Sequence, residues 1–428
     1  MHRPRGGARR DRSAARARRN RACGRRRRAR DRALAAAIDR PGRTRLRTRR
    51  ARRGAVVSGA DPARAALDAA VIAWTQEDPW RRDDARFDEL ALALFAFQFA
   101  RCAPYRRFCE ARARTPADVR RWQDVPAVPT GAFKELALTS FPRERAVHVF
   151  RTSGTALAGE QRGALLLDTL AVYEASLHAS FRRGVLPDLA PGAGVSLHVL
   201  APSAAEAPDS SLSHMFDVVM RDLGAPYNSH WIAGGALDVP RALRELAAAE
   251  MSSEAVAVCG TAFAFVHLLD ELERQQLRFA LPDSARVMET GGFKGRSRSV
   301  PRDQLHAWIA DRLGVPPARI VNQYGMTELG SQFYDSVLGE PGAPRRKLAP
   351  PWTRVRILDP IGGAEVAPGE LGRIAVLDLA NTGSVSALET ADLGRAIGDG
   401  FEVIGRDAGA EERGCSIGAD AMLADARP

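Results

Sequence analysis

Strand-like and helix-like segments alternate between residues 164 and 322, and this alternation constrains the fold most. Short apolar runs typical of buried strands occupy residues 164–167, 195–200, 255–259, 285–289 and 319–322. Segments with helical spacing of apolar residues separate them, and we expect Asp168 to cap the first such helix. This pattern predicts an α/β fold in which helices cover a largely parallel sheet.

The pattern changes after Pro351, where the helical spacing of apolar residues stops. Residues 355–358, 373–379, 385–388 and 401–404 are typical of strands joined by Gly and Asp turns. We therefore expect an α/β body over residues 56–350 and a β-rich subdomain over residues 351–428.

Positive charge is concentrated in one terminal segment. Residues 1–53 contain 23 Arg, no Lys and three acidic residues, a net charge of +20, so the rest of the chain carries −8. Such a segment repels itself and predicts a disordered tail over residues 1–55. Three interpretations stand: an arm for nucleic acid, an organellar transit peptide, or sequence upstream of a misplaced start, which we favour.

The apolar runs and the cysteines indicate in which cellular compartment the protein functions. No apolar run approaches the roughly 20 residues that span a bilayer, so we expect no membrane partner. The five cysteines are odd in number and form no C-x-x-C pair; they are Cys23, Cys102, Cys109, Cys259 and Cys415. Neither a disulfide framework nor a zinc site is indicated, and a reducing cytoplasm is expected.

Two glycine-containing motifs have the composition of nucleotide-binding loops. Residues 151–162 combine small hydroxyl residues with glycines, which suit phosphate oxygens, although Glu160 and Gln161 exclude a Walker loop. Residues 288–296 follow an expected strand, and their paired glycines would let a flat base or sugar lie against the backbone. The alternative interpretations are an exposed hairpin turn and a tight turn with a solvated Lys.

Two further motifs carry groups suited to a nucleotide. In residues 322–328, Tyr324 could stack on a purine, Thr327 could meet a phosphate oxygen and Glu328 could bind magnesium. Asp392, expected just after a strand, suits ribose hydroxyls, and Arg406 could add a hydrogen bond. A strand-to-loop turn with a surface Glu is the alternative for residues 322–328.

Together the four motifs resemble those of the adenylate-forming enzymes. Residues 152–155 resemble the phosphate loop of that superfamily, residues 324–328 its magnesium motif, and Asp392 with Arg406 its ribose pair. The resemblance implies ATP and Mg²⁺, with the metal on Glu328. The implied ATP-binding residues are Thr152, Ser153, Gly154, Thr155, Arg162, Gly291, Gly292, Tyr324, Gly325, Thr327, Asp392 and Arg406.

A closer resemblance is to the acyl-protein synthetase family of bacterial luciferase operons. It covers about residues 60–425, through residues 126–134, 151–155, 210–213, 288–296, 324–334 and 413–416. This resemblance implies a ligase that activates a fatty carboxylic acid as an acyl-adenylate. The acyl group then passes to Cys415 as a thioester, for a partner acyl reductase or another acyl-acceptor protein.

The chain departs from the superfamily in its phosphate loop and at its end. Ala156 replaces a Thr, and Gln161-Arg162 replaces Pro-Lys, so Arg162 is the candidate for the missing charge. The chain ends thirteen residues after Cys415, so we expect no full C-terminal lid domain. Lys294 and Arg296 are then the candidates to stabilise the transition-state phosphate.

Two alternatives to the acyl-protein synthetase remain open at this point. A CoA ligase would use CoA as the acceptor thiol and release a free thioester. A basic nucleic-acid-binding protein without catalysis would bind RNA or DNA through residues 1–53, with a strong dependence on salt.

Overall fold

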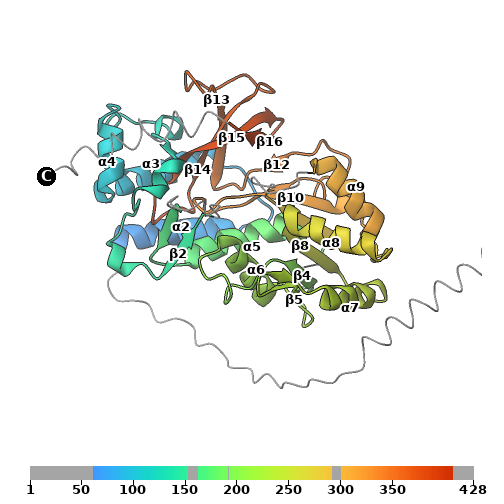
Figure 1. Ribbon diagram of the computed structural model, residues 1–428. Helices are drawn as coiled ribbons and strands as arrows, with labels where there is room; N and C mark the ends of the chain where they lie inside the picture. The colour runs from blue at the N-terminus through green and yellow to red at the C-terminus, as the bar shows by residue number, and fades with distance from the viewer. Residues whose placement is uncertain (1–60, 153–161, 191, 292–299, 408–428) are drawn as a thin grey trace, which may run out of the picture.

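One mixed sheet runs through the computed structural model, which describes residues 61–152, 162–190, 192–291 and 300–407 (Figure 1). Its strand order is β13-β14-β15-β16-β12-β11-β10-β9-β8-β4-β5, and β1 (Val128–Pro129) pairs with β15. The strands from β5 to β10 are parallel, and those from β10 to β13 are antiparallel. The predicted helix-covered, largely parallel sheet is therefore confirmed for the body of the chain.

The parallel strands alternate with helices along the chain, as the apolar pattern predicts. These strands are β4 (Ser196–Leu200), β5 (Ser229–His230), β8 (Val256–Thr261), β9 (Arg286–Thr290) and β10 (Ile320–Tyr324). The helices between and before them are α5 (Ala171–Val185), α6 (Ser211–Asp222), α7 (Val239–Glu250), α8 (Ala262–Arg274) and α9 (Arg302–Leu313). Two short two-stranded sheets flank them: β2 (His148–Arg151) with β3 (Ala164–Leu167), and β6 (Ile232–Ala233) with β7 (Ala236–Leu237).

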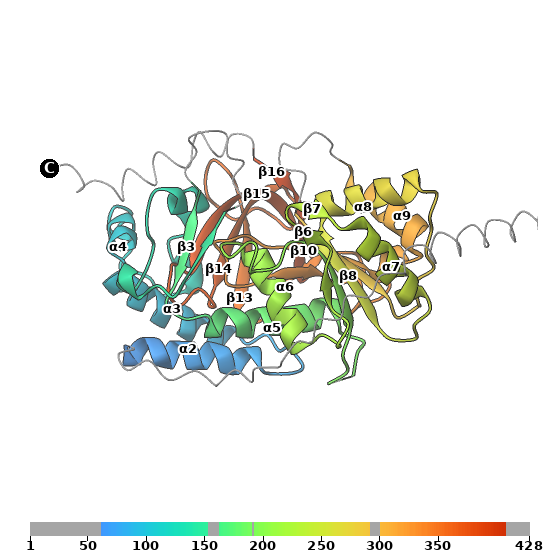
Figure 2. The ribbon, with the colours of Figure 1, turned by 60° about the horizontal axis from the view of Figure 1, so that its bottom comes forward.

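Alternate residues of the parallel strands face two different apolar cores. Val258, Val287 and Ile320 pack with α7, α8 and α9 on one face of the sheet. Cys259 and Met288 belong to the other core, which contains α5 and α6. This two-residue alternation is what a strand buried on both faces requires, and Figure 2 shows α7, α8 and α9 grouped at one end of the molecule.

Three helices form the first described part of the chain. They are α2 (Pro62–Thr75), α3 (Asp84–Arg101) and α4 (Ala103–Glu110). Asp61 and Asp83 cap α2 and α3 through their side chains, which accept hydrogen bonds from the backbone amides of Ala63 and Arg86 in the first turns. The prediction that Asp168 caps α5 is wrong: α5 starts after Leu170, and Asp168 instead pairs with Arg64 of α2 at 3.2 Å.

The strands after residue 350 continue the same sheet. Two antiparallel strands precede residue 350, β11 (Phe333–Asp335) and β12 (Lys347–Leu348), and four follow it: β13 (Thr353–Leu358), β14 (Gly372–Asp378), β15 (Ala387–Ile397) and β16 (Gly400–Arg406). β15 is longer than expected, so Asp392 lies within a strand and not after one. The division of the chain at residue 350 stays a prediction. No helix among the described residues is long and apolar enough to cross a bilayer.

Candidate active site

An open cleft lies where the parallel strands β9 and β10 end, opposite the hairpin of β15 and β16. It encloses about 1780 Å³, part of which is open to solvent at its mouth. Residues from three of the four sequence motifs line it: Gly291, Tyr324, Gly325, Glu328, Asp392 and Arg406. Ligands of parallel α/β sheets bind at the carboxyl ends of the strands, so this cleft is the candidate active site.

The floor of the cleft is built from directly opposed residues of β9 and β10. Glu289 and Asn322 are register partners, and the Asn322 amide donates to Oε1 of Glu289 at 2.7 Å. His306 of α9 contributes its Nε2 to the same oxygen at 3.1 Å. The Glu289 side chain is only 2% exposed, so these contacts hold a buried carboxylate in place.

A buried ion pair supports this floor from behind. Lys347 of β12 donates to the side-chain oxygen of Asn322, to its backbone carbonyl at 2.7 Å, and to Asp335 at 2.7 Å. Arg345 binds the other Asp335 oxygen at 2.5 Å. Burial on its own raises the pKa of Asp335, but Lys347 and Arg345 outweigh it and hold that pKa below its usual value.

The rim of the cleft carries the predicted ribose pair. Asp392 and Arg406 are cross-strand partners in β15 and β16, with 3.5 Å between Oδ1 and Nε. The Tyr324 hydroxyl donates to the other Asp392 oxygen at 2.9 Å. Burial raises the pKa of Tyr324 well above its ordinary value, and the Asp392 charge raises it further. Tyr324 is therefore a neutral donor that orients the Asp392 carboxylate.

The backbone conformation or the close packing requires glycine at two positions in the cleft. Gly291 has a φ of +75°, and a Cβ placed on it would have no atom within 4 Å, so its open side faces the cleft. At Gly325 a Cβ would lie 2.5 Å from the Gln323 amide nitrogen. A side chain at either position would strain the backbone or displace a neighbour.

The ends of the first motif close a hairpin beside this cleft. Thr152 exchanges backbone and side-chain bonds with Gly163, each of 2.9 Å. Arg162 donates to the Thr152 carbonyl at 2.6 Å and pairs with Asp209 at 2.7 Å, so its charge already has a partner. Thr327 donates to the Arg151 carbonyl at 3.4 Å, which places the first and third motifs side by side.

Several predicted site residues lie outside the described residues: Ser153, Gly154, Thr155, Gly292, Lys294, Arg296 and Cys415. Their roles, and that of Arg162 toward phosphate, stay predictions. Lys347, Asp335 and His306 also support the site, and no sequence motif contains them. Glu289 and Asn322 lie inside the second and third motifs, so their position at the ends of expected strands was the one signal that could have found them.

The three described cysteines are unsuited to nucleophilic chemistry. Cys102, Cys109 and Cys259 are fully buried. Burial raises the pKa of Cys102 to about 11 and the pKa of Cys109 and Cys259 to about 12 each. Since the thiolate is the reactive form, these three side chains fit the apolar core.

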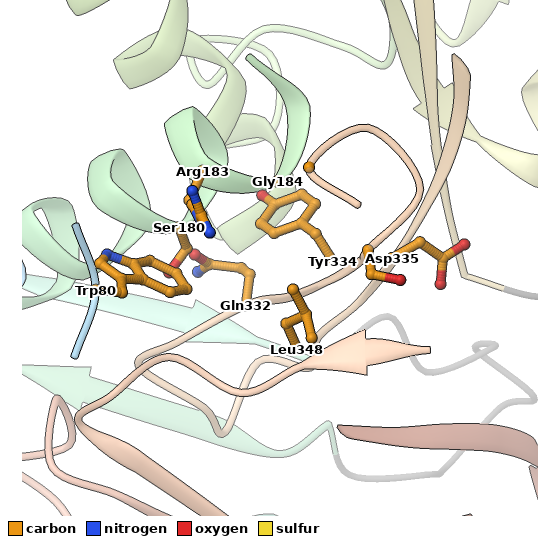
Figure 3. Close-up of a pocket in the computed structure, with 10 residues that line it drawn as sticks. Trp80, Ser180, Arg183, Gly184, Gln332, Tyr334, Asp335 and Leu348 are labelled. Atoms are coloured by element: carbon orange, nitrogen blue, oxygen red, sulfur yellow. The ribbon is translucent and has the colours of Figure 1, made fainter. Parts of the chain in front are cut away.

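A second, smaller pocket lies between α5 and β11 (Figure 3). Trp80, Tyr334 and Leu348 form its apolar walls. Two buried atoms in its lining, Oγ of Ser180 and Oε1 of Gln332, have no hydrogen-bond partner among the described residues. The pocket shares no lining residue with the cleft, although Asp335 of the buried ion pair lines it.

Solved structures with a similar fold are adenylate-forming ligases. The chain matches 2-hydroxyisobutyryl-CoA ligase bound to 2-HIB-AMP in its postadenylation state, with a TM-score of 0.55 and 15% identity, over 76% of this chain and 69% of that one. An open conformation bound to 2-HIB-AMP and CoA matches with a TM-score of 0.53 and 16% identity, over 75% of each chain. The chain spans 50% of the ATP-bound MatB from Rhodopseudomonas palustris. At these identities the likeness concerns the fold.

Sequence comparison identifies the family. A curated relative, the long-chain-fatty-acid–luciferin-component ligase of Aliivibrio fischeri, is 22% identical over 332 residues, which are 76% of this chain and 83% of the relative. A model of the family described as "Acyl-protein synthetase, LuxE" matches residues 53–424. Because that match covers most of the chain, this protein belongs to the LuxE family of acyl-protein synthetases, which are ligases.

Proposed function

We propose that the cleft binds ATP and a fatty carboxylic acid, forms the acyl-adenylate there, and passes the acyl group to Cys415. The carboxylate oxygen attacks the α-phosphorus of ATP, and pyrophosphate leaves. The Cys415 thiolate, after losing its proton to solvent, then attacks the acyl carbon and AMP leaves. The observation that carries the proposal is the cleft itself, which gathers Gly291, Tyr324, Glu328, Asp392 and Arg406 from three distant segments.

The rim residues are suited to hold the ribose. Asp392 has an anionic oxygen oriented by Tyr324, and carboxylates are strong acceptors for a pair of hydroxyl groups. Arg406 is 65% exposed at the mouth, so its guanidinium is free to turn toward a phosphate or the ribose. Positioning of this kind is the main contribution that a protein makes to phosphoryl chemistry.

Glu328 suits a magnesium ion that travels with ATP. Magnesium keeps several waters and takes only one or two protein carboxylates besides substrate phosphates. The described residues contain no group of three or more His, Cys, Asp or Glu that could hold a metal. A single cleft carboxylate therefore fits the magnesium of a nucleotide better than a resident metal centre. When bound there, magnesium would neutralise charge on the leaving pyrophosphate.

The end of β16 lies at the cleft rim and precedes Cys415 closely in the sequence. The chain leaves the sheet at the rim, where the Asp407 amide donates to the Ala391 carbonyl at 2.9 Å and Asp407 pairs with Arg373 at 3.0 Å. Cys415 follows Arg406 by nine residues, a span of at most about 30 Å when extended. Because the described cysteines are buried, Cys415 and Cys23 remain as candidates, and the family resemblance favours Cys415.

Labelling with a radioactive long-chain fatty acid tests this transfer. The protein with ATP and magnesium should acquire label that neutral hydroxylamine releases, as expected of a thioester. Cys415→Ala should lose the label but keep ATP–pyrophosphate exchange, because adenylation comes first. Cys23→Ala, the matched control, should label normally. Label that persists in Cys415→Ala would overturn the carrier assignment. Formation of acyl-CoA when CoA is added, without label on the protein, would favour the CoA ligase.

Substitution of Glu328 tests the magnesium proposal. Glu328→Gln keeps the shape of the side chain and removes its charge, so exchange should fall by about a hundredfold or more. The apparent magnesium requirement should rise at the same time. Glu402→Gln, which neutralises another cleft-lining carboxylate, is the matched control. Equal exchange rates and magnesium requirements in the Glu328 variant and the wild type would contradict the assignment.

A further inference from the structure

We propose that the pocket between α5 and β11 is a binding site for a small hydroxylated aromatic carboxylate, of which 4-hydroxybenzoate is the simplest example. The hydroxyl group of the ligand lies at the inner end of the pocket, its ring along the apolar walls and its carboxylate at the mouth. The residues that carry this inference do not line the cleft, so it does not depend on the proposed adenylation reaction.

Two buried polar side chains line the inner end of the pocket. Ser180 is 0% exposed and Gln332 is 5% exposed. Among the described residues, neither Oγ of Ser180 nor Oε1 of Gln332 has a hydrogen-bond partner. Buried polar atoms are nearly always paired, so two unpaired atoms in one pocket indicate a ligand group or an ordered water between them.

A hydroxyl group of a ligand matches both atoms. The Gln332 side chain is also hydrogen-bonded to Tyr173, and the atom left without a partner is its carbonyl oxygen, which only accepts. The Ser180 hydroxyl can donate, so a ligand hydroxyl that donates to Gln332 can accept from Ser180. An ammonium group would suit these atoms less well, because it would bury a charge in a pocket that Arg183 already lines.

The walls of the pocket suit an aromatic ring. Trp80, Tyr334 and Leu348 form them (Figure 3). Trp80 packs edge-to-face on the buried Trp352, with 5.3 Å between the ring centroids. Tyr334 approaches α5 closely because Gly184 lacks a side chain, and a Cβ there would lie 2.4 Å from the Tyr334 side chain. The pocket encloses about 340 Å³, part of it open to solvent, which suits one ring and not a nucleotide.

A cation lies at the mouth of the pocket. Arg183 lines the pocket and is exposed. Among the described residues, no ion pair or hydrogen bond engages its guanidinium, whereas the neighbouring Arg182 donates to the Leu189 carbonyl at 3.4 Å. A guanidinium binds a planar carboxylate through two parallel N–H donors. Trp80 and Arg183 also line two larger surface grooves, through which a ligand can enter.

Calorimetric titration of the full chain with three related ligands tests the site. 4-Hydroxybenzoate has all three features, benzoate lacks the hydroxyl group, and 4-hydroxybenzyl alcohol lacks the carboxylate. The protein should bind 4-hydroxybenzoate at least about tenfold more tightly than either of the others, because each omitted group leaves a protein group unpaired. Equal affinity for the three ligands, or absence of 4-hydroxybenzoate binding, would overturn the proposal and leave an ordered water as the occupant.

A matched pair of arginine variants locates the ligand. Arg183→Gln should weaken 4-hydroxybenzoate binding about tenfold or more, because a charge-assisted hydrogen bond is lost. Arg182→Gln, which changes a residue outside the pocket lining, should keep the wild-type affinity. Unchanged affinity in Arg183→Gln would place the ligand elsewhere, the cleft included, and would overturn the assignment.

Ser180→Ala tests the inner end of the pocket. The variant should lower the preference for 4-hydroxybenzoate over benzoate to about threefold or less, since the Ser180 hydroxyl no longer distinguishes the two ligands. An unchanged preference in the folded variant would contradict the assigned orientation. Arg183 is a surface residue, so its variant decides the matter even if Ser180→Ala does not fold. Pyrophosphate exchange with a fatty acid should stay at the wild-type rate in Arg183→Gln, which keeps this test separate from that of the proposed function.

Discussion

The floor and the rim of the cleft are built in opposite ways. At the floor, Glu289 is 2% exposed, and its neighbours bind one another through a chain that ends in the buried Lys347–Asp335 pair. At the rim, the Asp392 side chain is 17% exposed and that of Arg406 is 65% exposed, with 3.5 Å between them. The floor is thus part of the folded core, whereas the rim is a surface that a ligand can complete.

This difference predicts that substitutions in the two regions fail for different reasons. Buried charges depend on their partners, and removal of one partner leaves a desolvated charge behind. Exposed pairs are screened by water and contribute little to stability. Floor variants should therefore lose stability together with binding, and rim variants should lose binding alone.

The largest expected effect is on stability, from a substitution beneath the floor. Lys347→Met should destabilise the fold by about 3–5 kcal/mol, because it leaves Asp335 with Arg345 as its remaining cation and the Asn322 oxygen without a donor. Urea unfolding followed by circular dichroism measures this change. Arg406→Met at the rim is the matched control and should change stability by less than about 1 kcal/mol. Similar losses in both variants would remove the distinction between floor and rim.

The next largest effect is expected on the KM for ATP, from a substitution at the rim. Asp392→Asn keeps an oxygen for the Tyr324 hydroxyl but removes the charge proposed to bind the ribose. The KM for ATP in pyrophosphate exchange should rise about 10-fold to 100-fold, as expected for a hydrogen bond to a charged group. The melting temperature should stay within about 2 °C of the wild type. A large fall in melting temperature, or an unchanged KM, would contradict the assignment of Asp392 to the rim that binds ribose.

The rim could be found in the sequence and most of the floor could not. Tyr324, Glu328 and Asp392 belong to short motifs in which the chemistry is carried by residues close together in the chain. Lys347 and Asp335 reach Asn322 only because β11 and β12 pair beside β10, and strand pairing of this kind leaves no local pattern. His306 likewise needs the packing of α9 beside β9.

Contacts between distant segments also explain why the predictions for Asp168 and Asp392 were wrong. Asp168 has the residue type of a helix cap, but Arg64, distant in sequence, binds its carboxylate and the helix starts later. Asp392 was expected after a strand because the expected strand over residues 385–388 ends before it, yet β15 continues through it to pair with β14 and β16. Element types could be predicted from local periodicity, whereas contacts between distant segments could not.

A smaller effect is expected where floor and rim meet. Tyr324→Phe removes the hydroxyl that orients Asp392, while the ring keeps its packing 6.0 Å from Phe401. The KM for ATP should rise by about 3-fold to 10-fold with kcat almost unchanged, since one hydrogen bond from a neutral donor is lost. Pyrophosphate exchange at varied ATP concentration measures this KM. In the double variant with Asp392→Asn, the rise in KM should be smaller than the product of the two single-variant rises. Full additivity would mean that Tyr324 acts independently of Asp392.

The smallest effect should come from removal of the arginine-rich segment, which contains none of the named floor or rim residues. A chain that starts at Val57 keeps Asp61, whose side chain caps α2 and pairs with Arg101, so the first described helix retains its contacts. Exchange activity and melting temperature should then match those of the full chain. Binding of RNA or DNA at low salt should disappear with the segment if its charge alone attracts nucleic acid. Loss of exchange on truncation would show that the segment supports the cleft. Salt-dependent nucleic-acid binding in a full chain without any exchange would favour the nucleic-acid-binding alternative over the proposed ligase reaction.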